Sequence, residues 1–282
     1  MPEPLDAAVL RERLVPPYAA LDVFASTGST NAELSASAAR GAADATVLLA
    51  EEQTAGQGRR SRQWVSPTGS GIYTSVLLRP SGVRPAQLGS LTLVAGVALV
   101  RAVRAVTGLR VVLKWPNDVL VADGGGKCAG VLAETVAAAG PPAVVLGMGL
   151  NVFALPEGVP AGAGGLAPTS LAQAGAVELD RGELAIAVLA TLAELQATWR
   201  AAEGDLNVAG ILAQYREYCA TLGSRVRVEL AAAPGPGAGA TLTGLAEDVD
   251  ATGALGLRTD DGRLRQVCAG DVVHLRPVRA AG

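Results

Sequence analysis

The sequence is poor in the residue types on which several kinds of protein chemistry depend. Its 282 residues include one histidine and three cysteines, and aromatic residues make up 3%. A single histidine, His274, offers neither a zinc site nor a Ser/His/Asp triad. The three scattered cysteines, Cys128, Cys219 and Cys268, do not predict a disulfide framework. A reduced, cytoplasmic location is expected instead.

An excess of basic charge is also missing. The formal net charge is −3, whereas a protein whose main partner is nucleic acid carries surplus Lys and Arg to neutralise phosphates. About 25 residues precede the first polar motif, too few for a three-helix DNA-binding unit, so we expect no specific DNA partner. The longest dense apolar run, Leu91 to Val100, is about half a bilayer span, and no signal peptide is visible, so no membrane association is expected.

Apolar residues make up half of the chain, and their pattern predicts an α+β protein of two domains. Three strand-like runs joined by short turns predict an antiparallel meander between residues 111 and 150, as part of a mixed or antiparallel sheet. A kink or strand end is expected at Pro116, within the first run, before Val119–Val121 resume the strand. Helices are expected over residues 6–14, 85–107, 180–203 and 207–220. From Gly223 onward the pattern changes to short alternating strands, which predicts a small β-barrel. The domains are therefore placed at residues 1–222 and 223–282.

The segment Ala50–Trp64 is the most distinctive stretch of the larger domain. Gly56 and Gly58 allow a tight turn whose backbone can approach a ligand, and Arg59, Arg60 and Arg62 follow them. Backbone N–H groups in such a turn bind anions, and guanidinium groups match phosphate and carboxylate. The pattern indicates a loop that folds over an anionic small molecule. A flexible hairpin connection with solvated charges is the alternative.

Other polar motifs give partial signals. Ser29-Thr30-Asn31 precedes a helix, where it either caps the helix or binds a polar ligand group. Lys127 follows a glycine turn, but Val121 and Cys128 break the P-loop pattern. Gly147-Met148-Gly149 lacks the third glycine of a dinucleotide-binding motif. With lysine, arginines and backbone amides but no evident nucleophile, the chain suits phosphoryl or nucleotidyl transfer, where the substrates supply the chemistry.

Four segments together resemble the biotin–protein ligase family. They are Ser29-Thr30-Asn31; Ala50–Arg60 with Trp64; Lys114-Trp115-Pro116-Asn117-Asp118 with Lys127, Ala129 and Gly130; and Gly147–Asn151. The Lys-Trp-Pro-Asn-Asp run is the most specific of them. The resemblance implies a class II synthetase-like (SH2-like) catalytic domain with flanking helices, followed by an SH3-like C-terminal domain. It also implies that biotin and ATP form biotinyl-5′-AMP, and that biotin then passes to a lysine of the biotin carboxyl carrier domain of acetyl-CoA carboxylase or a related acyl-CoA carboxylase.

The resemblance also implies roles for individual residues. Lys127 and Arg59 would be catalytic. The biotin-binding set would be Ser29, Thr30, Asn31, Gln53, Gln57, Gly58, Arg59 and Lys127. The set for ATP and the adenylate would be Arg59, Arg60, Trp64, Asn117, Asp118, Lys127 and Asn151. Asp118 would either contact Mg²⁺ or fix the turn after Pro116.

Two departures from the family pattern and two other functions remain open. Gln57 stands where the family usually has Arg, which matters only if the guanidinium and not the backbone binds the intermediate. Cys128 replaces an aliphatic residue and is expected to act as a small hydrophobe.

A lipoate–protein ligase would share the architecture and chemistry. A non-enzymatic adaptor that senses a ligand is the other alternative, which intact Lys127 and Arg59 disfavour.

Overall fold

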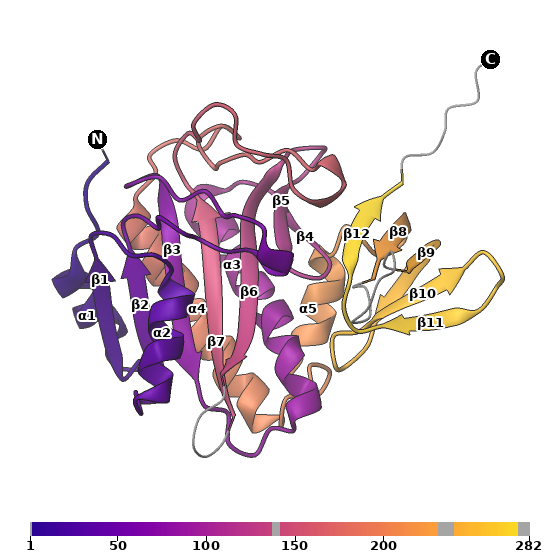
Figure 1. The fold of residues 1–282 in the computed structure, drawn as a ribbon, viewed down its shortest axis with the longest axis horizontal. Coiled ribbons are helices and arrows are strands. Elements are labelled where there is room, and N and C mark those ends of the chain that lie inside the picture. The colour runs from indigo at the N-terminus through magenta and orange to yellow at the C-terminus, as the bar shows by residue number, and fades with distance from the viewer. Residues whose placement is uncertain (1, 137–141, 231–239, 276–282) are drawn as a thin grey trace.

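The fold consists of two β-sheets, a larger one covered by helices and a smaller one beside it (Figure 1). The computed structural model describes residues 2–136, 142–230 and 240–275. The strand order is β1-β2-β3-β7-β6-β5-β4 in the seven-stranded sheet and β11-β10-β9-β8-β12 in the five-stranded sheet. The turn predicted at Gly140–Pro142 lies partly outside the described residues, and the loop predicted at Ala231–Gly239 lies wholly outside them.

The larger sheet is mixed, as the sequence predicts. Its strands are β1 (Ala20–Phe24), β2 (Thr46–Ala50), β3 (Gly71–Leu78), β4 (Val111–Lys114), β5 (Asp118–Val121), β6 (Lys127–Val136) and β7 (Ala143–Asn151). The pair β1–β2 is parallel, and every other pair in this sheet is antiparallel. The predicted meander is confirmed as β4 to β7, which follow one another in the chain and in the sheet. It has four strands and not the predicted three, because the chain reverses at Pro116 and makes β4 and β5 separate strands.

Helices cover both faces of the larger sheet. They are α1 (Ala7–Leu14), α2 (Thr30–Ala39), α3 (Leu91–Thr107), α4 (Arg181–Ala201) and α5 (Ile211–Tyr218), with 3₁₀ turns η1 (Arg59–Ser61), η2 (Pro85–Ser90) and η3 (Ala163–Gly165). In β2, Leu48 packs under α2 with Leu34. Its neighbours Val47 and Leu49 belong to the cluster that contains α3 and α4. Because successive strand residues point to opposite faces, one apolar run supports both helix layers.

The most apolar helical segment is the centre of this core. By length and composition, Pro85–Thr107 would be long enough to cross a membrane, but 78% of its apolar window is buried inside the fold. The sequence predicts one continuous helix here, whereas the structure has η2 followed by α3. Ser90 marks the junction, and its hydroxyl accepts a 2.8 Å hydrogen bond from Trp199 Nε1 of α4. The segment is therefore a core helix, as the sequence indicates.

The C-terminal part of the chain forms the predicted all-β unit. Its antiparallel strands are β8 (Arg225–Glu229), β9 (Thr241–Val249), β10 (Leu255–Thr259), β11 (Leu264–Val267) and β12 (Asp271–His274). This sheet lies beside α5 and β4 (Figure 1). Trp115 is fully buried at the junction and donates 3.0 Å hydrogen bonds to Thr221 Oγ1 and the Gly253 carbonyl. A single hydrophobic cluster includes residues of both sheets, so the two sheets share one core.

The cysteines provide a simple chemical test of this packing. All three are free thiols, Cys128 and Cys219 being buried and Cys268 exposed. Burial raises the pKa of Cys128 to about 12, and burial also raises that of Cys219. Since the thiolate is the reactive form, we expect maleimide at neutral pH to label the native protein at Cys268 alone. Peptide mass mapping measures this, with denatured protein as the control in which all three sites react. Rapid labelling of Cys128 in the native state would contradict the packing described.

Candidate active site

A cavity of about 210 Å³ lies against β3, β6 and β7 of the larger sheet. Segments far apart in the sequence meet there, from the first turn of α2 to the chain after β7. All the predicted site residues except Arg60 line it: Ser29, Thr30, Asn31, Gln53, Gln57, Gly58, Arg59, Trp64, Asn117, Asp118, Lys127 and Asn151. The residues singled out from the sequence therefore share one place in the fold.

One end of the cavity is a network of neutral polar groups at the start of α2. Ser29 is the N-cap residue, but its side chain makes no capping hydrogen bond. The backbone N–H and the hydroxyl of Thr30 both donate to Gln53 Oε1, at 2.9 and 3.1 Å. The fully buried Ser75 hydroxyl lies 2.7 Å from Thr30 Oγ1. Ser29 therefore occupies the N-cap position without capping the helix through its side chain. The side chain of Thr30 is held by Gln53 and by Ser75 of the sheet.

Asn31 extends this network to the neighbouring strands. Its Oδ1 lies 2.6 Å from Ser75 Oγ, and its Nδ2 donates to Glu134 Oε2 at 2.6 Å. Gly147 of β7 faces it so closely that an added Cβ would collide with the Asn31 carboxamide. The glycine leaves room for the amide, and fixed amide and hydroxyl groups suit a polar, uncharged ligand group. Ser75 and Glu134 carried no sequence signal, since each sits inside an ordinary strand.

Two paired glycines form a flat surface in the middle of the cavity. Gly130 of β6 pairs with Gly149 of β7. Trp64 lies directly over them, because a Cβ on Gly149 would be 2.5 Å from its Cε2 atom. Trp64 Nε1 is buried and has no hydrogen-bond partner among the described residues. An indole N–H of this kind is a donor available to a ligand.

Lys127 stands at the edge of this surface with its charge held by Asp118. Lys127 Nζ lies 2.6 Å from Asp118 Oδ1 and 5.2 Å from the centre of the Trp64 ring. Lys114 Nζ approaches Asp118 Oδ2 at 3.6 Å. Burial lowers the pKa of Lys114, and the Asp118 charge opposes that effect. Two lysines around one carboxylate leave net positive charge in the cavity, which favours an anionic ligand group.

The residues around Asp118 do not fit a magnesium site. Both carboxylate oxygens face ammonium groups, and a divalent cation there would meet like charge. The part of the chain that the structure describes contains no cluster of three or more His, Cys, Asp or Glu residues that would hold a metal ion. The role in the turn is the one that the geometry favours, because Asp118 pairs with Lys114 across the turn after Pro116. Its carboxylate also orients Lys127, a contact that the sequence did not predict.

The Lys-Trp-Pro-Asn-Asp run forms a hairpin turn between β4 and β5. Lys114 and Asp118 are cross-strand partners, which places both charges at the cavity end of the hairpin. Asn117 Nδ2 donates to the Val131 carbonyl at 2.9 Å, and Asn117 Oδ1 accepts from Arg59 Nη1 at 3.3 Å. The strand does end before Pro116, but Val119–Val121 do not resume it, because the chain reverses there and β5 pairs antiparallel with β4. The turn fixes Asp118 and holds the most deeply placed arginine of the opposite loop.

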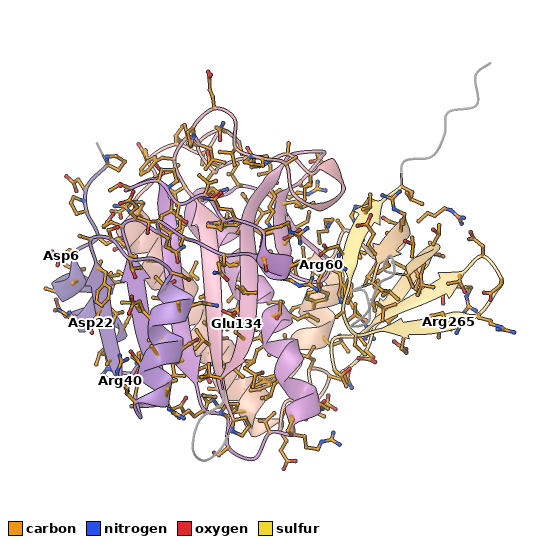
Figure 2. All side chains as sticks on the ribbon, viewed as in Figure 1. Asp6, Asp22, Arg40, Arg60, Glu134 and Arg265 are labelled. Atoms are coloured by element: carbon orange, nitrogen blue, oxygen red, sulfur yellow. The ribbon has the colours of Figure 1, made fainter. Side chains whose placement is uncertain are left out.

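That opposite loop, residues 56–64, we call the arginine loop. It closes on itself through Gly58 N–H to the Arg62 carbonyl at 2.7 Å and Trp64 N–H to the Gly56 carbonyl at 2.9 Å. A Cβ on Gly56 would lie 2.6 Å from the Trp64 carbonyl oxygen, so glycine is needed for this closure. Arg60 is outside the cavity lining and instead bonds Asp271 of the C-terminal sheet at 3.0 Å, at the junction seen in Figure 2.

Sequence reasoning missed one wall of the cavity. It is formed by residues 155–168, of which Leu155, Val159, Pro160, Ala161, Gly162, Leu166 and Pro168 line the cavity. This segment is anchored by Lys127 N–H to the Ala167 carbonyl at 2.8 Å and by Asn151 Nδ2 to the Thr169 carbonyl at 2.9 Å. A Gly/Pro-rich stretch lacks the hydrophobic periodicity from which a helix or strand is predicted. Only its position directly after the Gly147–Asn151 motif indicated that it could lie near the site.

A cavity that joins a neutral polar end, a tryptophan over paired glycines and a lysine–arginine end defines a class of enzyme: ligases that activate a carboxylic acid with a nucleotide. A model of the Biotin/lipoate A/B protein ligase family matches residues 23–151, and a model of the Biotin protein ligase C terminal domain matches residues 221–275. The second match covers the whole five-stranded sheet and separates the biotin branch of this class from the lipoate branch.

Individual relatives agree with the family models. The chain is 44% identical to a biotin–[acetyl-CoA-carboxylase] ligase of Mycobacterium tuberculosis over 97% of both chains. It is 35% identical to a ligase of the same name from Paracoccus denitrificans, over 86% of this chain and 95% of that one. Among solved structures, the biotin protein ligase of Aquifex aeolicus in complex with biotin and ATP has a TM-score of 0.73 at 25% identity, covering 92% of this chain and all of that one. The chain belongs to the biotin protein ligase family.

Proposed function

We propose that this enzyme makes biotinyl-5′-AMP from biotin and ATP and transfers the biotinyl group to a lysine of a biotin carboxyl carrier domain. The observation that carries the proposal is the convergence of the family's motif residues on one cavity with a neutral polar end and a cationic end. The relative from Mycobacterium tuberculosis is named as a biotin–[acetyl-CoA-carboxylase] ligase, and this supports acetyl-CoA carboxylase as the source of the acceptor domain.

The reaction consists of two substitutions, the first at the α-phosphorus of ATP and the second at the acyl carbon of biotin. In the first, a carboxylate oxygen of biotin forms a bond to the α-phosphorus of ATP, and the bond to pyrophosphate breaks. In the second, the acceptor lysine amine attacks the acyl carbon, AMP leaves with the bonding electron pair, and the amine loses a proton to solvent. Neither step requires a nucleophile from this chain, which agrees with the residues that line the cavity.

The polar end of the cavity suits the ureido group of biotin. We propose that Ser29, Thr30 and Asn31 bind it together with Gln53, because their hydroxyl and amide groups are already oriented by Ser75 and Glu134. Pre-oriented groups bind with a smaller loss of side-chain entropy. This network presents both donors and acceptors, as a ureido group requires.

The cationic end suits the reacting anions. Lys127 is proposed to contact the biotin carboxylate and the α-phosphate, reducing their repulsion and stabilising the charge that develops during transfer. Gln57, Gly58 and Arg59 are proposed to cover them, while Trp64, Asn117 and Asn151 line the space assigned to the nucleotide. Mg²⁺ bound with ATP would neutralise further phosphate charge. This chain's residues around Asp118 do not supply its ligands.

A single assay tests the proposed function against its alternatives. The protein is incubated with ATP and radiolabelled biotin, or in parallel with radiolabelled lipoate, and the acyl-adenylate is resolved by thin-layer chromatography. We expect an adenylate with biotin and none with lipoate. An adenylate with lipoate alone would identify a lipoate ligase, and binding of biotin without any adenylate would favour the ligand-sensing adaptor.

We also propose that the enzyme acts in the cytoplasm, with the carrier domain as its macromolecular partner. The free state of all three cysteines supports a reducing compartment. The net negative charge of the chain is consistent with a protein partner. Helix α3 is apolar because it is buried in the core of the fold.

Binding to specific DNA is not expected. The net charge is −3, and α1 and β1 are built into the catalytic sheet and its helix layer. Nucleic-acid affinity of a site-specific binder depends on neutralising phosphates with Lys and Arg. In a gel-shift assay at physiological salt with biotin and ATP present, we expect no complex that survives competitor DNA. A sequence-specific complex resistant to competitor would contradict this.

A further inference from the structure

Three arginines of the arginine loop converge on one carboxylate of the C-terminal sheet. Arg60 Nη1 lies 3.0 Å from Asp271 Oδ2, and Arg62 Nη2 lies 3.1 Å from Asp271 Oδ1. Arg59 Nη1 is further away, at 3.8 Å, and also donates to the Gly270 carbonyl at 3.1 Å. Asp271 is 6% exposed at its side chain, so these guanidinium groups cover it almost completely. Neighbouring like charges would repel one another without this shared counter-charge.

The carboxylate sits on a rigid part of the C-terminal sheet. Asp271 is the first residue of β12 and pairs with Glu229 of β8. A Cβ on Gly270 would lie 2.7 Å from Val228 Cγ1, which shows how closely this corner is packed. Burial opposes ionisation of Asp271, but hydrogen bonds and charge from Arg62 and Arg60 prevail and lower its pKa. Asp271 is therefore a charged, fixed anchor at neutral pH.

The same strand also contacts the second segment that encloses the cavity. Gly164 of η3 packs on β12, where an added Cβ would lie 2.8 Å from Val273 Cγ2. Gly162 and Leu166, on either side of η3, line the cavity. Strand β12 thus contacts the loop that carries Arg59 and the loop that forms the apolar wall. These contacts come from alternate residues of one strand.

We propose that Asp271 is a positioning residue that holds the arginine loop against the cavity, so that the C-terminal domain helps to retain the bound adenylate. The proposal rests on the proposed function for the identity of the ligand. Without the Asp271 charge, the loop would lose its anchor and would have to be ordered by the ligand alone. Ordering the loop costs conformational entropy for each residue that is fixed.

Hydrogen exchange on the full-length, ligand-free protein tests the anchor without reference to activity. Asp271→Asn keeps the size of the side chain and removes its charge. We expect faster exchange at residues 56–64 and unchanged exchange in β3 and β7. The matched control is Asp260→Asn, which removes an exposed carboxylate of the same domain that pairs with Arg225. The control should leave the loop unchanged.

Adenylate release tests the functional part. With biotinyl-5′-AMP bound, Asp271→Asn should dissociate the adenylate roughly tenfold faster, the factor expected for losing one hydrogen bond to a charged group. The KM for biotin should rise, while kcat for adenylate synthesis changes little because Lys127 stays in place. Arg62→Gln should speed release as well, and the double variant should be no worse than the more affected single variant.

Several outcomes would overturn the proposal. Unchanged exchange of residues 56–64 in Asp271→Asn would show that Asp271 does not hold the loop. Faster exchange with unchanged adenylate release would show that the anchor does not retain the ligand. Fully additive effects of Arg62→Gln and Asp271→Asn would remove the link between them. Failure of the proposed function itself would appear differently, as a lack of adenylate in the unmodified protein while the loop still responds to Asp271→Asn.

Discussion

Lys127→Ala is expected to lower the rate of biotinyl-5′-AMP synthesis by a factor of about 10²–10³. Its ammonium group lies at the cationic end of the cavity, with its side chain 21% exposed and held at 2.6 Å by Asp118. No protein nucleophile is assigned to the reaction, so the loss of this charge removes transition-state stabilisation directly. The fold should persist, because Asp118 keeps its contact with Lys114 and the lysine fills no part of the hydrophobic core.

Pyrophosphate release under saturating ATP measures this effect, with thermal unfolding as the check on folding. Arg110→Ala is the matched control, since it removes a cation that is 70% exposed and is not part of the cavity lining. The control should retain the full rate. Near-normal pyrophosphate release by Lys127→Ala would show that the lysine has no role in adenylate synthesis.

Gly147→Ala is expected to raise the KM for biotin by roughly 10- to 100-fold, corresponding to about 1–3 kcal/mol for a displaced buried polar group. The added methyl group would collide with the Asn31 carboxamide. Asn31 would then lose its contacts with Ser75 and Glu134, and the polar end of the cavity would no longer be ordered. Binding of ATP should change much less, because Lys127 and Arg59 lie at the other end.

Calorimetric titration with biotin and with an ATP analogue separates these two effects. Gly89→Ala provides the control: that glycine has no neighbour within 4 Å of an added Cβ, and it lies outside the cavity lining. It should bind both ligands normally. Equal biotin affinity in Gly147→Ala and Gly89→Ala would exclude Asn31 from the biotin site.

The individual strands and helices could be predicted from the sequence, because each has a local pattern of apolar and turn-forming residues. The meander between residues 111 and 150 follows from apolar runs separated by turn residues, and the strand end at Pro116 follows from its missing N–H. The change of pattern at Gly223 indicated the second sheet. What the sequence could not show is that Trp115 of the most distinctive motif serves mainly to join the two sheets, through Thr221 and Gly253.

The part of the site that could be predicted consists of side chains whose charge or hydrogen-bonding groups suggest a ligand. Lys127, Arg59 and the Ser29–Asn31 segment were singled out from their residue types and from the family resemblance, and the structure brings them to one cavity. Their roles toward the ligands stay predictions. The glycines of the Gly147–Asn151 motif were recognised, but their physical reason, the close approach of Asn31 and Trp64, depends on the three-dimensional packing. The family resemblance assigned Arg60 to the adenylate, whereas in the structure its side chain forms a hydrogen bond with Asp271 of the C-terminal sheet.

Long-range charge pairing was the main element beyond the reach of the sequence. The repulsion among the arginines of the loop suggested that an anion must arrive with the ligand. The structure supplies a protein anion as well, Asp271, more than 200 positions away in the chain, as the sequence separation of 211 for Arg60 shows. An aspartate in a short terminal strand has no local feature that marks such a role. Only the fold brings it to the arginine loop.

Transfer of biotin to a carrier domain tests the central claim most directly. The full-length enzyme is incubated with biotin, ATP and a biotin carboxyl carrier domain of acetyl-CoA carboxylase, and the intact mass of the acceptor is followed with time. The account predicts the addition of one biotinyl group at one lysine, dependent on ATP and absent when that lysine is replaced by arginine. An acceptor that stays unmodified, while a known biotin protein ligase modifies it under the same conditions, would contradict the account.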